Sequence, residues 1–237
     1  MRRLGLVALL LAGSFLATPR ASASDPAHIA MYVTPWYNSS GPVIKIGQYS
    51  SGLASRNPAA FVATIRRMKA HWNSLSFLEL YVGAIQLYDR GFRNEATYWF
   101  YSAQYQGRLF AMLVDRNKLG TIGNTSFELY HGQEAFFTLA GPTINGFAFG
   151  NIGLLSAIVV RVQNENRSVP NMRHIYEGVA FVNDSRWPSV NAELNAGLGK
   201  LAAQLNDERT QIEQERRQNG TQARFEHLTS NPFPGGY

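Results

Sequence analysis

The chain contains no cysteine. This absence excludes disulfide bonds, thiolate metal sites, a cysteine nucleophile and a lipidated N-terminal cysteine. The protein must therefore fold without covalent cross-links between its side chains. About 214 residues follow residue 23, which is enough chain to bury one core without covalent cross-links.

Sequence signatures of catalysis and nucleotide binding are also missing. There is no G-x-S-x-G, no phosphate-binding G-x-x-x-x-G-K-[ST] and no H-E-x-x-H. The glycines at 146 and 150 lack the spacing and the preceding strand of a dinucleotide-binding loop. Basic residues do not cluster beyond Arg66, Arg67 and Lys69, so no nucleic-acid partner is expected.

The N-terminus has the three parts of a secretory signal peptide. A cationic start, Met1-Arg2-Arg3, precedes the uncharged apolar residues 4–17 and the small-residue site Ala21-Ser22-Ala23. We predict a signal peptide over residues 1–23 and a periplasmic or secreted mature chain. No later segment is apolar enough over about 20 residues to span a bilayer. Cleavage removes three of the 22 basic residues and none of the 16 acidic ones, so the net charge falls from +6 to +3.

The sequence predicts a mainly α fold, a helical bundle of about five to six helices with a small N-terminal β-hairpin. Residues 29–37 and 43–49 are rich in β-formers on either side of a turn-rich segment at 38–42, which predicts the hairpin. We expect one mostly helical domain over residues 24–220 and a disordered tail over residues 221–237.

Helix boundaries are marked by capping residues. Asn57-Pro58 predicts a helix start, and Ser76 with Glu79 predicts a capping box for a second helix that ends before Gly91. Further helices are expected near 94–114, from Ser126 to Gly141, over 153–164 and from 189 onward. The highly charged residues 207–217 should project into solvent. A short strand at 179–182 is expected within the connection 167–188.

Residues 87–109 carry the most specific pattern. Leu87 and Gly91 close one helix, and Ala96, Trp99 and Ala103 recur on the next, with Gly107 after them. This stretch resembles one hairpin of the tetratricopeptide or Sel1-like repeat families. The resemblance implies two closely packed antiparallel helices of a type used to bind proteins. Only one copy is found, and such repeats need about three units, so an ordinary helical hairpin in a globular core remains open.

Three groups of residues are candidates for function. Tyr98, Tyr101, Tyr105 and Arg108 are expected to form a protein-binding surface, since Tyr and Arg are enriched at interface hot spots. The weak catalytic candidates are Glu128, His131 and Glu134. His131 and Glu134 share a helix face, but a metal would need a third ligand from His28, His71 or His174, none at a recognised spacing. We expect neither a metal nor a cofactor.

The leading functional hypothesis is an exported, non-enzymatic protein-binding domain. One version of it is an immunity or inhibitor protein of the cell envelope, whose partner is another protein. Two alternatives stay open. One is a cell-wall-acting hydrolase that uses Glu128, His131 and Glu134. The other is an envelope assembly factor that docks through residues 207–217.

Overall fold

A computed structural model describes residues 25–29 and 47–234. Within these ranges the chain forms helices and no strand, which confirms the prediction of a mainly α fold. The signal peptide predicted for residues 1–23 lies outside the described residues. The α-helices are α2 (Ser50–Leu53), α3 (Pro58–Ala70), α4 (Phe77–Asp89), α5 (Arg93–Leu113), α6 (Thr125–Ala148), α7 (Ile152–Glu165), α8 (Met172–Ile175), α9 (Trp187–Asp207), α10 (Arg209–Gln218) and α11 (Thr221–Phe225). Short 3₁₀ helices are η1 (Trp72–Ser74), η2 (Arg116–Lys118) and η3 (Asp184–Arg186).

The predicted N-terminal β-hairpin is not supported. Most of it, residues 30–46, lies outside the described residues. Its two described ends are not strands: Ile29 donates its backbone N–H to Asp89 Oδ1 at 2.8 Å, and residues 47–49 form a turn into α2. Tyr49 and Leu53 are buried as core residues, which one helical turn accomplishes as well as a strand. The strand expected at 179–182 is a single antiparallel bridge between Val114 and Phe181.

The predicted capping residues act as expected. Asn57 Oδ1 accepts from the backbone N–H groups of Ala59 and Ala60 at 2.9 and 3.3 Å. Ser76 and Glu79 form the capping box of α4. Gly91 follows α4 with a φ of 82°, in the left-handed region that glycine adopts without strain.

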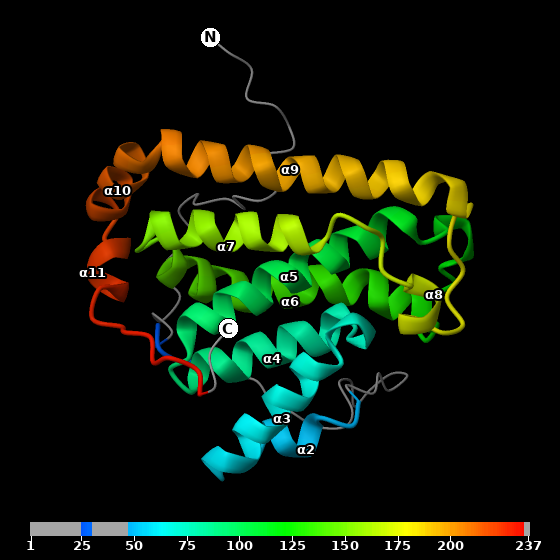
Figure 1. The fold of residues 1–237 in the computed structure, drawn as a ribbon, viewed down its shortest axis with the longest axis horizontal. Helices are drawn as coiled ribbons and strands as arrows, with labels where there is room; N and C mark the ends of the chain where they lie inside the picture. Colours follow the sequence, from blue (N-terminus) through cyan, green and yellow to red (C-terminus); the bar gives the residue numbers. More distant parts are fainter. Residues whose placement is uncertain (1–24, 30–46, 235–237) are drawn as a thin grey trace.

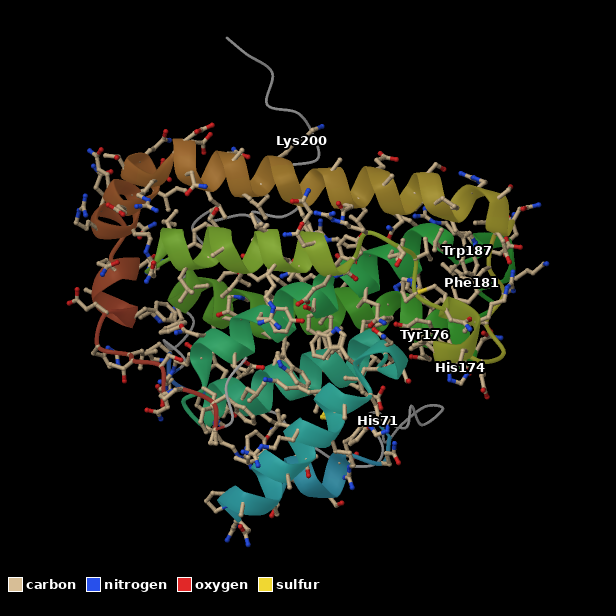
Figure 2. The ribbon with its side chains drawn as sticks, viewed as in Figure 1. His71, His174, Tyr176, Phe181, Trp187 and Lys200 are labelled. Atoms are coloured by element: carbon tan, nitrogen blue, oxygen red, sulfur yellow. The ribbon has the colours of Figure 1, made fainter. Side chains whose placement is uncertain are left out.

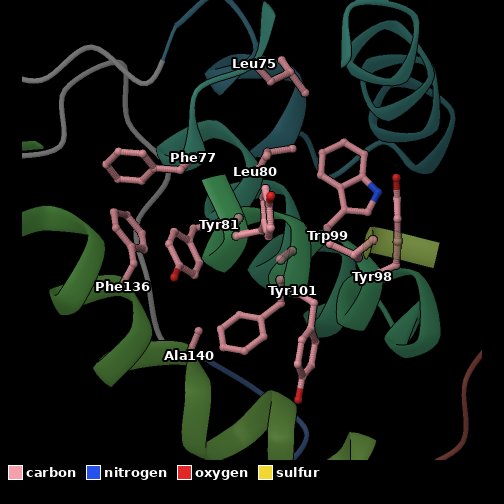
Figure 3. Close-up of a cluster of buried hydrophobic side chains, with 14 of the residues drawn as sticks. Leu75, Phe77, Leu80, Tyr81, Tyr98, Trp99, Tyr101, Phe136 and Ala140 are labelled. Carbon is pink, nitrogen blue, oxygen red and sulfur yellow. The ribbon is translucent and has the colours of Figure 1, made fainter. Parts of the chain in front are cut away.

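Helix α5 lies at the centre of the bundle (Figure 1). It contacts α4, α6, α7 and α9, and residues 95–107 are buried on every side of the helix. Figure 3 shows the aromatic core between α4, α5 and α6, where the Tyr81 and Phe136 rings stack with centroids 5.4 Å apart. The approach of α4 to α5 is close, because a Cβ atom at Gly83 would lie 2.6 Å from the Trp99 ring.

Helix α6 is longer than predicted. It begins after the cap Asn124, not Ser126, and continues through Pro142 to Ala148. Proline removes one backbone donor and usually ends a helix. Here Ala140, Thr143 and Ile144 are buried around Pro142, so packing holds the helix together across this position. The helix predicted to end at Gly141 therefore continues to residue 148.

The connection from α7 to α9 is closed by aromatic side chains. Tyr176, Phe181 and Trp187 gather around α8 at one end of the molecule (Figure 2). Phe181 lies 5.5 Å from Trp187 between ring centroids, and the Tyr176 hydroxyl accepts the backbone N–H of Phe77 at 3.0 Å. These contacts attach a segment with little secondary structure to α4 and α5.

The C-terminal part differs from the disordered tail that we expected. Residues 221–225 form α11, and the following chain runs back past the end of the bundle where α4 turns into α5 (Figure 1). Asn231 donates its backbone N–H to the Gly91 carbonyl at 2.8 Å, and Phe233 is buried against the Phe92 ring. The charged helix α10 is mostly exposed, but Arg216 within it is buried. No helix in the described ranges is long and apolar enough to cross a membrane.

Candidate functional site

The prediction that the tyrosines of α5 form an exposed protein-binding surface is wrong. Tyr98, Tyr101 and Tyr105 are at most 4% exposed, because residues 95–107 of α5 are packed on all sides. Tyr101 donates to Asn145 Oδ1 on α6 at 3.1 Å, and Tyr105 donates to Asn191 Oδ1 on α9 at 2.9 Å. These two tyrosines therefore join α5 to its neighbouring helices.

Arg108 is half-buried in the same core. It lies close enough to Tyr81 and Tyr101 to interact with them electrostatically. Burial lowers the pKa of the guanidinium, and the two tyrosines oppose this change. Like the tyrosines, Arg108 belongs to the interior contacts of α5 and not to an open surface.

The weak catalytic candidates do not converge on a site. His131 and Glu134 are exposed on α6, and Glu128 accepts the backbone N–H of Gly123 at 3.1 Å near the start of that helix. His131 packs against the Phe127 ring, with centroids 4.4 Å apart. Neither of the two cavities described below includes any of the three side chains. The geometry gives no support to a hydrolase built on them.

The histidines do not assemble a metal centre either. His71 and His174 lie on different elements (Figure 2), and the His71 ring instead contacts the Arg67 carbonyl oxygen at 2.8 Å. His28 pairs with Asp89 at 2.9 Å. Across residues 25–29 and 47–234, no three His, Asp or Glu side chains come together as metal ligands would.

The candidate site is a cavity beside the C-terminal end of α7, which we call the Trp72 cavity. Its volume is about 680 Å³, within the range of small-ligand and peptide-side-chain pockets. It is bounded by the end of α3, by η1, α4, α5 and the loop that follows α7. Its lining residues are Lys69, Trp72, Asn73, Leu80, Tyr98, Ser102, Gln106, Arg161, Glu165, Asn166, Ser168, Pro170 and Asn171.

A stack of three planar side chains forms one wall of the Trp72 cavity. The rings of Trp72 and Tyr98 are 5.3 Å apart with an interplanar angle of 14°, and the Arg161 guanidinium carbon lies 3.9 Å from the Tyr98 centroid. Figure 3 shows Tyr98 and Trp99 projecting from neighbouring positions of α5. The Trp99 ring packs edge to face against the Trp72 ring, with centroids 5.0 Å apart. Tyr98, the one predicted binding residue at the cavity, thus contributes a buried wall.

Glu165 holds this stack in place from the end of α7. Its Oε2 accepts the Tyr98 hydroxyl at 2.5 Å, and its Oε1 accepts Arg161 Nε at 2.8 Å. Burial raises the pKa of Tyr98, and the hydrogen bond to the Glu165 carboxylate raises it further. Tyr98 is therefore a neutral donor at physiological pH, and it is not poised to act as a base.

A buried ion pair supports the floor of the cavity. Lys69 Nζ lies 2.7 Å from Glu95 Oε1, and the Trp99 indole N–H donates to the same oxygen at 2.8 Å. Glu95 is 3% exposed, so this carboxylate is out of contact with solvent and neutralised by the lysine at the cavity wall. With the Arg161–Glu165 pair, each cation in the lining has its own carboxylate.

One buried amide in the cavity wall has an unused acceptor. Gln106 donates through Nε2 to the Leu75 carbonyl at 2.8 Å, while its Oε1 has no hydrogen-bond partner among the described residues. An acceptor left unpaired in the interior costs free energy. A ligand with an N–H or O–H group would satisfy it.

The loop after α7, which forms one side of the cavity, is held in place by hydrogen bonds from α9. Asn191 and Asn195 on α9 donate to the Asn166 carbonyl at 3.1 and 3.2 Å. Two neighbouring side chains, Asn166 and Tyr105, add further bonds to this junction. The wall of the cavity is thus preformed. The sequence offered little signal for this site, because its residues come from four separate stretches, 69–73, 80, 98–106 and 161–171.

We find no similarity of this chain to any family model, any curated protein or any solved structure.

Proposed function

We propose that this chain is a non-enzymatic binding protein that takes a segment of another protein in the Trp72 cavity. The observation that carries the proposal is the stack of Trp72, the buried Tyr98 and Arg161 in the cavity wall, together with the unused Gln106 acceptor. Tryptophan, tyrosine and arginine are the residue types enriched at binding hot spots. A peptide bond supplies the N–H group that Gln106 Oε1 lacks.

The charges in the cavity define the segment further. Lys69 and Arg161 are each paired with a glutamate, so the lining has no spare cation for an acidic ligand. A segment with a neutral, apolar or aromatic side chain against Trp72 avoids leaving a new charge unpaired. The lining also offers little for acid–base catalysis. Glu165 is its single acid, and this carboxylate already accepts two hydrogen bonds.

The proposal includes export of the chain from the cytoplasm. With a signal peptide over residues 1–23, the partner is sought in the periplasm or the medium, and an immunity or inhibitor protein of the envelope is the concrete version. An assembly factor that docks through residues 207–217 has less support. Arg216, in that segment, is turned into the protein, and α10 packs against α11.

Site-specific photo-crosslinking tests the proposal in the full chain in its native host. A photoreactive phenylalanine replaces the exposed rim residue Asn73, and a matched control places it at Ile122, which is 79% exposed and outside the cavity. We expect a discrete crosslinked protein at position 73 that Ser168→Trp abolishes, because that exposed rim position can fill the cavity without disturbing the core. Equal products at 73 and 122, or a product that Ser168→Trp leaves unchanged, would overturn the proposal.

A further inference from the structure

A second, smaller cavity lies where α7 begins, which we call the Arg216 cavity. Its volume is about 300 Å³. Its lining residues come from α5, the turn from α6 to α7, α7, α10, α11 and the chain after α11, and these elements lie together at one end of the bundle (Figure 1). None of its residues belongs to the Trp72 cavity. Its lining residues are Asn94, Thr97, Phe147, Ala148, Gly150, Asn151, Leu154, Leu155, Ile158, Arg216, Gln222, Phe225, Glu226, Leu228 and Ser230.

Arg216 is the unusual member of this lining. Its side chain is 4% exposed, yet neither Nη1 nor Nη2 has a hydrogen-bond partner within the described ranges. The guanidinium is held only through Nε, which lies 3.4 Å from Gln222 Oε1. Burial of a guanidinium without an anion is unfavourable, and here burial lowers its pKa. Buried charges in proteins are normally paired, so two buried donors on one guanidinium without an acceptor are suited to bind an anion.

The surroundings of Arg216 favour negative charge. Helix α7 begins at this cavity, and the N-terminal end of a helix carries partial positive charge. Arg209 adds a second cation nearby: a Cβ atom at Gly153 would lie 3.0 Å from one of its Nη atoms. The one acid in the lining, Glu226, is exposed and forms no ion pair with Arg216.

We infer that the Arg216 cavity binds a small monocarboxylate with an apolar body. A carboxylate matches the two parallel donors of a guanidinium, which bind it in a bidentate manner. Leu154, Ile158 and Phe225 supply apolar walls for the rest of the ligand. A phosphate dianion fits less well, because Arg216 is the single cation among the lining residues and Glu226 adds a negative charge to the same lining.

This inference is independent of the proposed function, since the two cavities share no lining residue. It is tested with benzoate and hexanoate as probes, by calorimetry and by the shift in melting temperature of the purified chain. Inorganic phosphate is the comparison anion. A short peptide ending in phenylalanine, with its C-terminus free or amidated, distinguishes a peptide carboxylate from a free acid.

Two variants keep the result interpretable. Gln222→Glu places a carboxylate of the same size next to Arg216, so it should abolish carboxylate binding while raising the melting temperature of the free protein. Arg216→Met removes the buried charge, and it should weaken binding at least about tenfold, as loss of one charged hydrogen bond implies. It should leave the ligand-free protein folded, because an unpaired buried charge is replaced by an apolar side chain.

Each result of these binding measurements either supports or overturns the inference. Benzoate or hexanoate binding that both variants lose supports the inference, and binding of only the free-acid peptide assigns the carboxylate to a polypeptide end. Tighter binding of phosphate than of benzoate would overturn it. So would the absence of any carboxylate effect in the wild-type chain, or equal binding by Gln222→Glu.

Discussion

Lys69 and Glu95 meet at 2.7 Å between Nζ and Oε1, one at the wall of the Trp72 cavity and the other 3% exposed beneath it. They belong to α3 and α5, which lie on either side of α4 in the sequence. The pair ties the first long helix to the central one. It also leaves a carboxylate in the interior that depends on a single cation.

Removal of Lys69 should therefore destabilise the fold. Lys69→Met leaves Glu95 buried with the Trp99 indole as its one side-chain partner among the described residues. Loss of one member of a fully buried pair costs about 3–5 kcal/mol, and since Lys69 is 26% exposed the cost should lie at or below the lower end of that range. Urea denaturation measures the change in free energy of unfolding. The control is Lys118→Met, which breaks an exposed pair with Asp115 worth about 0–1 kcal/mol. Equal effects of the two variants would contradict this account of the buried pair.

Two buried helix glycines should respond in opposite ways to alanine. A Cβ atom at Gly83 would lie 2.6 Å from the fully buried Trp99 ring, so Gly83→Ala should cost about 1–3 kcal/mol through overpacking. At Gly132 the nearest atom is 3.6 Å away, on Leu78, which is an ordinary contact. Gly132→Ala should gain about 0.5–1 kcal/mol from helix propensity. Thermal unfolding of both variants checks the prediction, and destabilisation by Gly132→Ala would speak against it.

The attachment of α11 should depend on Gly146. A Cβ atom there would come within 2.3 Å of the Phe225 ring, whereas at Gly141 in the same helix the nearest atom is 3.5 Å away. Gly146→Ala should displace Phe225 and loosen the chain from residue 221 onward. Limited proteolysis should then cut near α11 in Gly146→Ala but not in Gly141→Ala. Because Phe225 lines the Arg216 cavity, carboxylate binding should weaken in the same variant.

Stability should depend on pH through Glu79. Burial raises the pKa of Glu79 above its ordinary value of 4.5, against the lowering effect of hydrogen bonds from Ser76. A carboxyl group whose pKa is higher in the folded state stabilises the fold below pH 4.5, and this contribution is lost as the pH rises through the folded pKa. Relative to Glu79→Gln, the wild-type free energy of unfolding should therefore fall as the pH rises from 4.5.

The matched control for this measurement is Glu213→Gln, on the exposed side of α10. Urea denaturation across the pH series compares the three proteins. A wild-type profile parallel to that of Glu79→Gln would show that burial of Glu79 is not the cause of the dependence.

Local features of the structure were predictable from sequence because the interactions are local. Asn57 and the Ser76–Glu79 box bond to backbone groups within three residues, so their effect does not depend on the rest of the fold. The start of α6 was harder to predict. Asn124 and Ser126 are both residue types that cap helices well, so the first residue was ambiguous. The end was misplaced because Pro142 disfavours a helix in isolation, whereas the buried residues around it keep the helix intact in the fold.

The sequence by itself determined the helical composition, the principal caps and the close approach of α4 and α5 that small residues permit. Only the tertiary structure decided which faces are open. Apolar and aromatic periodicity indicates that one face of α5 is buried, but burial of its remaining faces depends on α6, α7 and α9 packing there. For that reason Tyr101 and Tyr105 are buried and hydrogen-bond to neighbouring helices. Trp72 and Arg216, which come from distant segments, line the two cavities.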